Sequence, residues 1–124
     1  MRIRDIVTLL EEKAPVATAE EWDNPGLLIG SGDADVDRVL AQAAPGDLLL
    51  LDRVLVALDA TPAALSEARR IGAQLLVTHH PVIFRPLRTL DAVSVPYQAA
   101  AAGIAVLSAH TNLDKATGGG NDTL

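Results

Sequence analysis

The sequence contains no cysteine, few aromatic residues and no long apolar run, and each lack excludes a class of protein. Without cysteine among its 124 residues, the chain cannot form disulfides, thiolate-ligated zinc sites, iron–sulfur clusters or a thiol nucleophile. Aromatic residues make up only 2% of the chain, which argues against a surface that stacks nucleic-acid bases. Apolar stretches such as Leu48–Leu51 are far shorter than the roughly 20 residues that cross a membrane.

Positive charge is also scarce. Lys and Arg number 10 against 16 Asp and Glu, which gives a formal net charge of −6 and an isoelectric point near 4.8. A general nucleic-acid surface or an anionic-membrane surface needs a basic face, so neither is expected as a partner. The N-terminal segment carries several charges and only a short apolar run, unlike a signal peptide. We therefore expect a cytoplasmic protein.

The apolar residues that are present suffice for one packed domain. Hydrophobic residues make up 49% of the chain, and a length of 124 residues fits a single domain. Apart from Gln74, the segments 54–58, 74–77 and 104–107 are continuously apolar, which is typical of parallel strands buried on both faces. Helices are predicted over 62–70 and 96–102, each beginning at a proline and followed by a glycine. We predict an α/β fold, with a mostly parallel sheet flanked by helices.

The rest of the chain is interpreted as one helix and several connectors. Apolar positions from Ile3 to Leu10 predict an amphipathic helix that ends before Pro15, and Leu27–Ile29 is a short strand. Residues 31–46 are expected to form a loop with room for a helical turn. Trp22 is expected to pack the connector onto the core, while the following Asp23 and Asn24 suit a turn. Residues 118–122 form a glycine-rich turn that can cradle an anion or precede a helix.

All three histidines of the chain come directly after predicted strands. His79 and His80 follow the strand at 74–77, and His110 follows the strand at 104–107. Right-handed crossovers place the carboxyl ends of parallel strands at one edge, where ligand sites form. Neutral imidazoles suit Zn, Fe, Mn, Ni or Co, and adjacent His79 and His80 can face two neighbouring ions. Two ions about 3.5–4 Å apart can activate a water molecule and hold a substrate oxygen.

The acidic residues near these strand ends, and His110 itself, each allow more than one interpretation. Asp114 is the natural carboxylate ligand from the third loop, or else a capping or solvated turn residue. Its segment, 110–114, is expected to be a loop rather than a helix. His110 can be a third imidazole ligand, an outer hydrogen-bond partner or a substrate contact, and we favour the outer role. For Asp59 we favour ordinary capping before the helix at 62–70.

Four motifs together resemble a known family. In chain order they are WDNPGL at 22–27, VALDAT at 56–61, THHPVIF at 78–84, and AHTNLD at 109–114 followed by GGGND at 118–122. Their order and content resemble the NIF-three-like family, which is catalogued in bacteria as GTP cyclohydrolase I type 2 homologs. The likeness runs over nearly the whole chain. The third and fourth motifs together are its most specific part.

The resemblance implies a ligand set and an assembly. By motif position, it makes His79, His80 and Asp114 metal ligands. His110, to which the resemblance assigns no role, is our own catalytic candidate, which would move a proton. The resemblance also implies ring-shaped homo-oligomers, commonly hexamers. Family members take a further histidine and glutamate from near the end of a longer chain, so the likeness covers an N-terminal half. We therefore expect residues 1–124 to be a single domain of a longer two-lobed protein, with a stretch at 31–52 that is longer than usual.

The activity that the resemblance implies is that of a metal-dependent hydrolase. It would be similar to GTP cyclohydrolase I type 2 and would act on a nucleotide or a related small molecule, with two divalent metal ions per complete subunit. The alternative is a non-catalytic metal-binding scaffold or regulator. Three side chains shared between two ions leave each ion with few protein ligands. We therefore expect the 124-residue chain alone to bind metal weakly or not at all.

Overall fold

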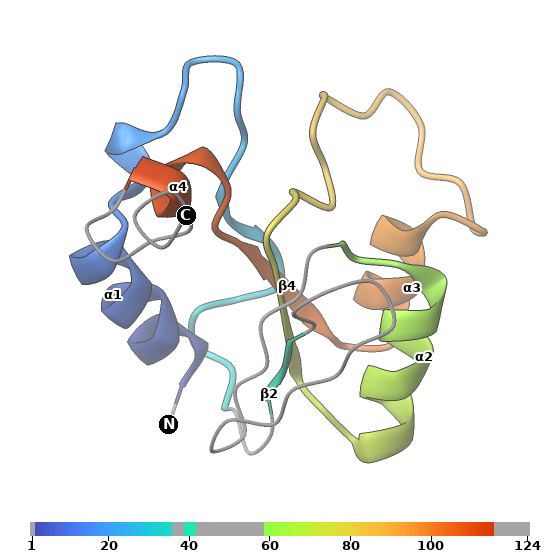
Figure 1. Cartoon of the computed structure of the whole chain (residues 1–124). Coiled ribbons are helices and arrows are strands. Elements are labelled where there is room, and N and C mark those ends of the chain that lie inside the picture. Colours follow the sequence, from blue (N-terminus) through green and yellow to red (C-terminus); the bar gives the residue numbers. More distant parts are fainter. Residues whose placement is uncertain (1, 36–38, 42–58, 116–124) are drawn as a thin grey trace.

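The computed structural model describes residues 2–35, 39–41 and 59–115 (Figure 1). The predicted strand at 54–58, the glycine-rich turn at 118–122 and most of the long stretch at 31–52 lie outside the described residues. The elements in chain order are α1 (Ile3–Lys13), the 3-10 helix η1 (Val16–Thr18), β1 (Gly26–Ile29), β2 (Val39–Ala41), α2 (Pro62–Ile71), β3 (Leu75–Thr78), α3 (Val95–Ala101), β4 (Ala105–Ser108) and α4 (Thr111–Lys115).

The four strands form one sheet in the order β1-β4-β3-β2. Strand β3 pairs in parallel with both β2 and β4, while β1 pairs antiparallel with the other side of β4. In Figure 1, α1 lies on one side of this sheet and the pair α2 and α3 lies on the other. The predicted fold, a mostly parallel sheet flanked by helices, is therefore confirmed.

The central strands β3 and β4 are buried along their whole length, as their continuous apolar runs predict. Leu75, Leu76 and Val106 have no solvent-exposed surface. The helices complete the core with apolar side chains, among them Ile3 from α1 and Leu65 from α2. Because β3 and β4 run parallel to each other, the loops that follow them emerge together at one edge of the sheet.

Helix α2 begins and ends at the capping residues that the sequence predicts. The Thr61 hydroxyl oxygen accepts a hydrogen bond from the Ala64 N–H at 3.0 Å, and Pro62 occupies the first helical position. Gly72, with φ of 72°, closes the helix in a left-handed conformation that favours glycine. None of the helices in the described ranges is long and apolar enough to cross a membrane. The short, well-capped helix returns the chain to start β3 in parallel with β2.

The structure differs from the sequence-based expectation in two segments. Val39–Ala41 form β2 rather than a loop or helical turn, because they pair with β3 in a ladder that sequence-local signals do not reveal. Thr111–Lys115 form α4 rather than a loop. The buried side chain of Asn112 accepts from the His110 N–H at 2.9 Å and donates to the Ala14 carbonyl at 2.8 Å. These contacts, one of them to a distant segment, hold the short helix in place.

Candidate metal centre

Strands β3 and β4 both end in a buried hydroxyl residue that shapes the loop after β3. Thr78 and Ser108 are partners in the parallel ladder. The Thr78 hydroxyl donates to the carbonyl of His80 at 2.8 Å, and the Ser108 hydroxyl donates to the carbonyl of His79 at 3.0 Å. Both carbonyls are thereby held against the strand ends. The backbone of the two adjacent histidines is fixed from inside the protein.

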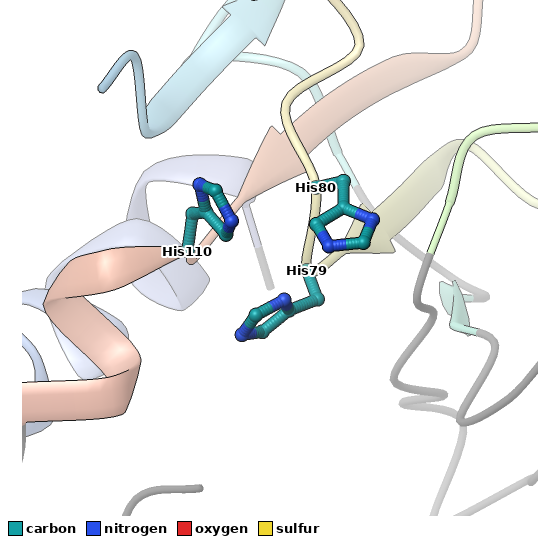
Figure 2. A group of neighbouring side chains, drawn as sticks. All are labelled: His79, His80 and His110. Atoms are coloured by element: carbon teal, nitrogen blue, oxygen red, sulfur yellow. The ribbon is translucent and has the colours of Figure 1, made fainter. Parts of the chain in front are cut away.

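His79, His80 and His110 converge at this edge of the sheet (Figure 2). Their ring centroids are 5.3 Å apart for His79 and His80, 5.0 Å for His79 and His110, and 5.1 Å for His80 and His110. One nitrogen from each ring lies within 4.8 Å of the other two, so the three can hold a metal ion. The loops after β3 and β4 therefore meet as the strand order predicts.

Carboxylates lie beside both histidines of the β3 loop. The Nε2 atom of His79 is 3.1 Å from Oδ1 of Asp114, which places Asp114 at the cluster that the sequence predicts for it. The Nδ1 atom of His80 is 2.7 Å from Oδ1 of Asp59. The capping interpretation of Asp59 is wrong, because the cap of α2 is Thr61 and the Asp59 carboxylate faces His80 instead.

The other ring nitrogen of His79, Nδ1, is unusual in its hydrogen bonding. This atom is buried and has no hydrogen-bond partner within residues 2–35, 39–41 and 59–115. Buried polar atoms are nearly always hydrogen-bonded, and exceptions point to a ligand, a water or an ion. Since His79 is part of the histidine cluster, a bound metal ion would account for this unpartnered nitrogen.

Asp23 lies against His110 with its side chain fully buried, at 0% exposure. Its Oδ1 atom is 2.8 Å from Nδ1 of His110 and accepts from the Asn24 N–H, while Oδ2 accepts from the N–H and the hydroxyl of Thr111 at 3.0 and 2.6 Å. Burial raises the pKa of Asp23, but hydrogen bonds from Thr111, His110 and Asn24 outweigh it and lower the pKa to about 2. Asp23 is therefore ionised at neutral pH, and its role is more than that of a turn residue.

Trp22 does not pack onto the core, contrary to the expectation from the sequence. Its side chain is 60% exposed, and its ring centroid lies 6.0 Å from that of Phe84 and 6.1 Å from that of His110. The side-chain amide of Asn24 donates to the Ile83 carbonyl at 2.7 Å and so holds the connector against the loop after the histidines. The first of the four motifs thus belongs to the histidine site, which its inclusion in the family pattern could have signalled.

Comparison with known proteins matches this chain to one family over nearly its whole length. The family model, described as Duf34/NIF3 (NGG1p interacting factor 3), matches residues 1–44 and 50–124. A Clostridium perfringens protein named GTP cyclohydrolase 1 type 2 homolog is 34% identical over 128 residues, which cover 100% of this chain and 43% of that protein. The chain thus spans less than half the length of this curated relative.

Two solved structures have the same fold. A Staphylococcus aureus hypothetical protein superimposes with a TM-score of 0.80 at 35% identity, over 96% of this chain and 31% of the other. A Bacillus cereus protein related to NIF3 gives a TM-score of 0.80 at 32% identity, over 98% of this chain and 31% of the other. The arrangement of helices and strands described above is therefore shared with longer proteins.

Proposed function

The chain belongs to the DUF34/NIF3 family, and from this premise we propose that its histidine cluster binds a divalent metal ion for a hydrolase reaction. The observation that carries the proposal is the convergence of His79, His80 and His110, with one nitrogen of each within 4.8 Å of the others. These are all the histidines of the chain, and they come from two loops more than 25 residues apart. Such a meeting of imidazoles suits a first-row divalent metal.

The hydrogen bonds around the cluster fit a metal ion. An imidazole that binds a metal usually directs its other nitrogen to a carboxylate or a carbonyl. His80 and His110 do so through Nδ1, to Asp59 and Asp23 respectively, which leaves Nε2 of each ring for an ion. The Nδ1 atom of His79 is buried without a partner in the described part of the chain. The donors accordingly suit Zn, Fe, Mn, Ni or Co.

We assign His79, His80 and His110 as nitrogen ligands and Asp114 as an oxygen ligand. The outer role favoured for His110 from the sequence is less well supported, because its ring lies as close to the other two rings as they lie to each other. Asp23 takes the outer position in its place. Asp114, 3.1 Å from His79, is the carboxylate that can serve the second ion of a complete dinuclear subunit.

A divalent ion bound here would supply an activated water molecule and would polarise a substrate oxygen. The residues of the chain determine how a substrate reaches the cluster and where His110 carries its proton. The His80 side chain is 43% exposed, so a small molecule can reach the cluster from solvent. The ionised Asp23 holds a proton on Nδ1 of His110. The name of the Clostridium perfringens relative leads us to propose a nucleotide or a related small molecule as the substrate.

The test has a binding step and a turnover step. The chain is stripped with a chelator and titrated calorimetrically with Zn²⁺, Mn²⁺, Co²⁺ and Ni²⁺. The loaded protein is then incubated with GTP and a panel of nucleotides and phosphoesters, and products are followed by mass spectrometry. Absence of metal binding overturns the whole proposal. Bound metal without turnover would favour a non-catalytic metal-binding scaffold and would overturn only the hydrolase part.

We also propose that the protein assembles into homo-oligomeric rings, and that complete subunits form hexamers. Five of the exposed large apolar side chains lie along one segment after the histidine loop, which supports a contact surface there. They are Phe84, Leu87, Leu90, Val93 and Tyr97. Light scattering coupled to size-exclusion chromatography measures the assembly, and a strictly monomeric protein at all concentrations would contradict it.

A further inference from the structure

The Asp23 carboxylate is the most heavily hydrogen-bonded acidic group around the histidine cluster. It accepts from His110, from the Asn24 backbone, and from both the backbone and the hydroxyl of Thr111. Its side chain is fully buried. By comparison, the Asp59 carboxylate beside His80 is 48% exposed. The two carboxylates make the same kind of contact to a histidine, but the Asp23 carboxylate is also buried and held by further hydrogen bonds.

The contact to His110 determines where that ring carries its proton. An ionised carboxylate only accepts hydrogen bonds, so Nδ1 of His110 must be the protonated nitrogen. The lone pair is then on Nε2. With Nδ1 turned to Asp23, Nε2 is the nitrogen of His110 that is available to a ligand in the cluster.

The same carboxylate also holds the beginning of α4. Its second oxygen accepts both the N–H and the hydroxyl of Thr111, the first residue of that helix. Within α4, the Asp114 N–H donates to the His110 carbonyl at 3.1 Å. A single buried group therefore fixes the ring of His110 and the helix that carries Asp114.

We propose that Asp23 is a positioning residue of the metal centre, which keeps His110 in the Nδ1–H tautomer and its Nε2 lone pair free for a ligand. The role of Asp23 in metal binding rests on the proposed function. The tautomer of His110, however, is a property of the metal-free chain. The proposal assigns a role to the first motif, whose residues the turn interpretation left without one.

The tautomer can be read directly by NMR. In the metal-free chain labelled with ¹⁵N-histidine at pH 8, long-range ¹H–¹⁵N correlations should show His110 protonated at Nδ1. In the Asp23→Asn variant, the amide oxygen stays with the Thr111 N–H and the NH₂ group faces His110, so His110 should change to the Nε2–H tautomer. The affinity for Zn²⁺ should fall about 10- to 100-fold, as for other outer partners of ligating histidines.

Two variants separate positioning from general destabilisation. Asp59→Asn should leave the tautomer of His110 unchanged, because Asp59 contacts His80. Thr111→Val removes one hydrogen bond to Asp23 but keeps its contact with His110, so it should also leave the tautomer unchanged. If Asp23→Asn does not fold, Asp23→Ser replaces it, since a serine hydroxyl is too short to reach His110.

Two results would overturn the proposal: His110 protonated at Nε2 or at both nitrogens in the wild-type chain, or an unchanged Nδ1–H tautomer once the carboxylate is removed. A chain that binds no Zn²⁺ but shows the expected tautomers would overturn the metal-binding function and leave the positioning role supported. The two failures are therefore distinguishable.

Discussion

The Nε2 atom of His79 lies 3.1 Å from the Oδ1 atom of Asp114, although 35 residues separate the two in the chain. They meet because the loops after two neighbouring parallel strands leave the same edge of the sheet. A carboxylate so close to an imidazole either shares an ion with it or accepts its N–H. The first arrangement is the one that the proposed metal centre requires.

Replacing Asp114 with alanine should therefore remove bound metal as fully as His79→Ala does, because both side chains are assigned as ligands. Asp59→Ala is the matched comparison, since Asp59 contacts only the outer nitrogen of His80, and it should weaken binding by about 10- to 100-fold. Metal content after dialysis and calorimetric affinity measure the difference. Equal, partial losses in both variants would show that Asp114 is an outer partner as well.

His110→Ala should lower metal affinity at least about 100-fold, as should His80→Ala, because the three rings form a nearly equilateral cluster with centroids 5.0–5.3 Å apart. Arg70→Ala, on the exposed side of α2, serves as the control and should keep full affinity. A His110→Ala protein that retains most of its metal but has lost turnover would restore the outer, catalytic role that the sequence favoured for this residue.

The sequence predicts well those features that depend on local runs and on strand order. The apolar runs at 74–77 and 104–107 became the buried strands β3 and β4. Because parallel strands share an edge, the position of His79 and His110 after these runs was enough to predict that they would meet. Thr61, Pro62 and Gly72 likewise bounded α2 correctly, since capping is a property of a few neighbouring residues.

The features that the sequence did not reveal depend on distant partners. Asp23 and Asn24 have the same turn propensity whether or not a histidine lies 87 residues further along, so the burial of Asp23 against His110 could not be inferred. Asp59 precedes a well-capped helix and was interpreted locally, although its carboxylate faces His80. Local patterns also gave no sign that Val39–Ala41 would pair with β3.

Thr78→Val should destabilise the fold by about 1–3 kcal/mol, because the hydrogen bond from the buried Thr78 hydroxyl to the carbonyl of His80 would be lost. Thr18→Val is the matched control: its hydroxyl also donates to a backbone carbonyl, that of Pro15 at 2.7 Å, but in an exposed turn where water can replace it. There the cost should stay below about 0.5 kcal/mol. Urea denaturation followed by circular dichroism measures both. Similar costs would show that the histidine loop does not depend on the strand-end hydroxyls.

Asp23 should make the stability of the metal-free chain depend on pH in the acid range. Burial raises its pKa, but the hydrogen bonds from Thr111, His110 and Asn24 prevail and lower the pKa from the usual 3.8 to about 2. A carboxyl group with a lowered pKa stabilises the folded state while it is ionised, so its contribution is complete above about pH 5 and is lost as the pH falls toward 2. The shift corresponds to about 2 kcal/mol. The difference in free energy of unfolding between the wild-type chain and Asp23→Asn should therefore shrink by about that amount between pH 6 and pH 2. Urea titrations across this range measure it, and a constant difference would mean that the folded state does not hold the Asp23 carboxylate in its ionised form.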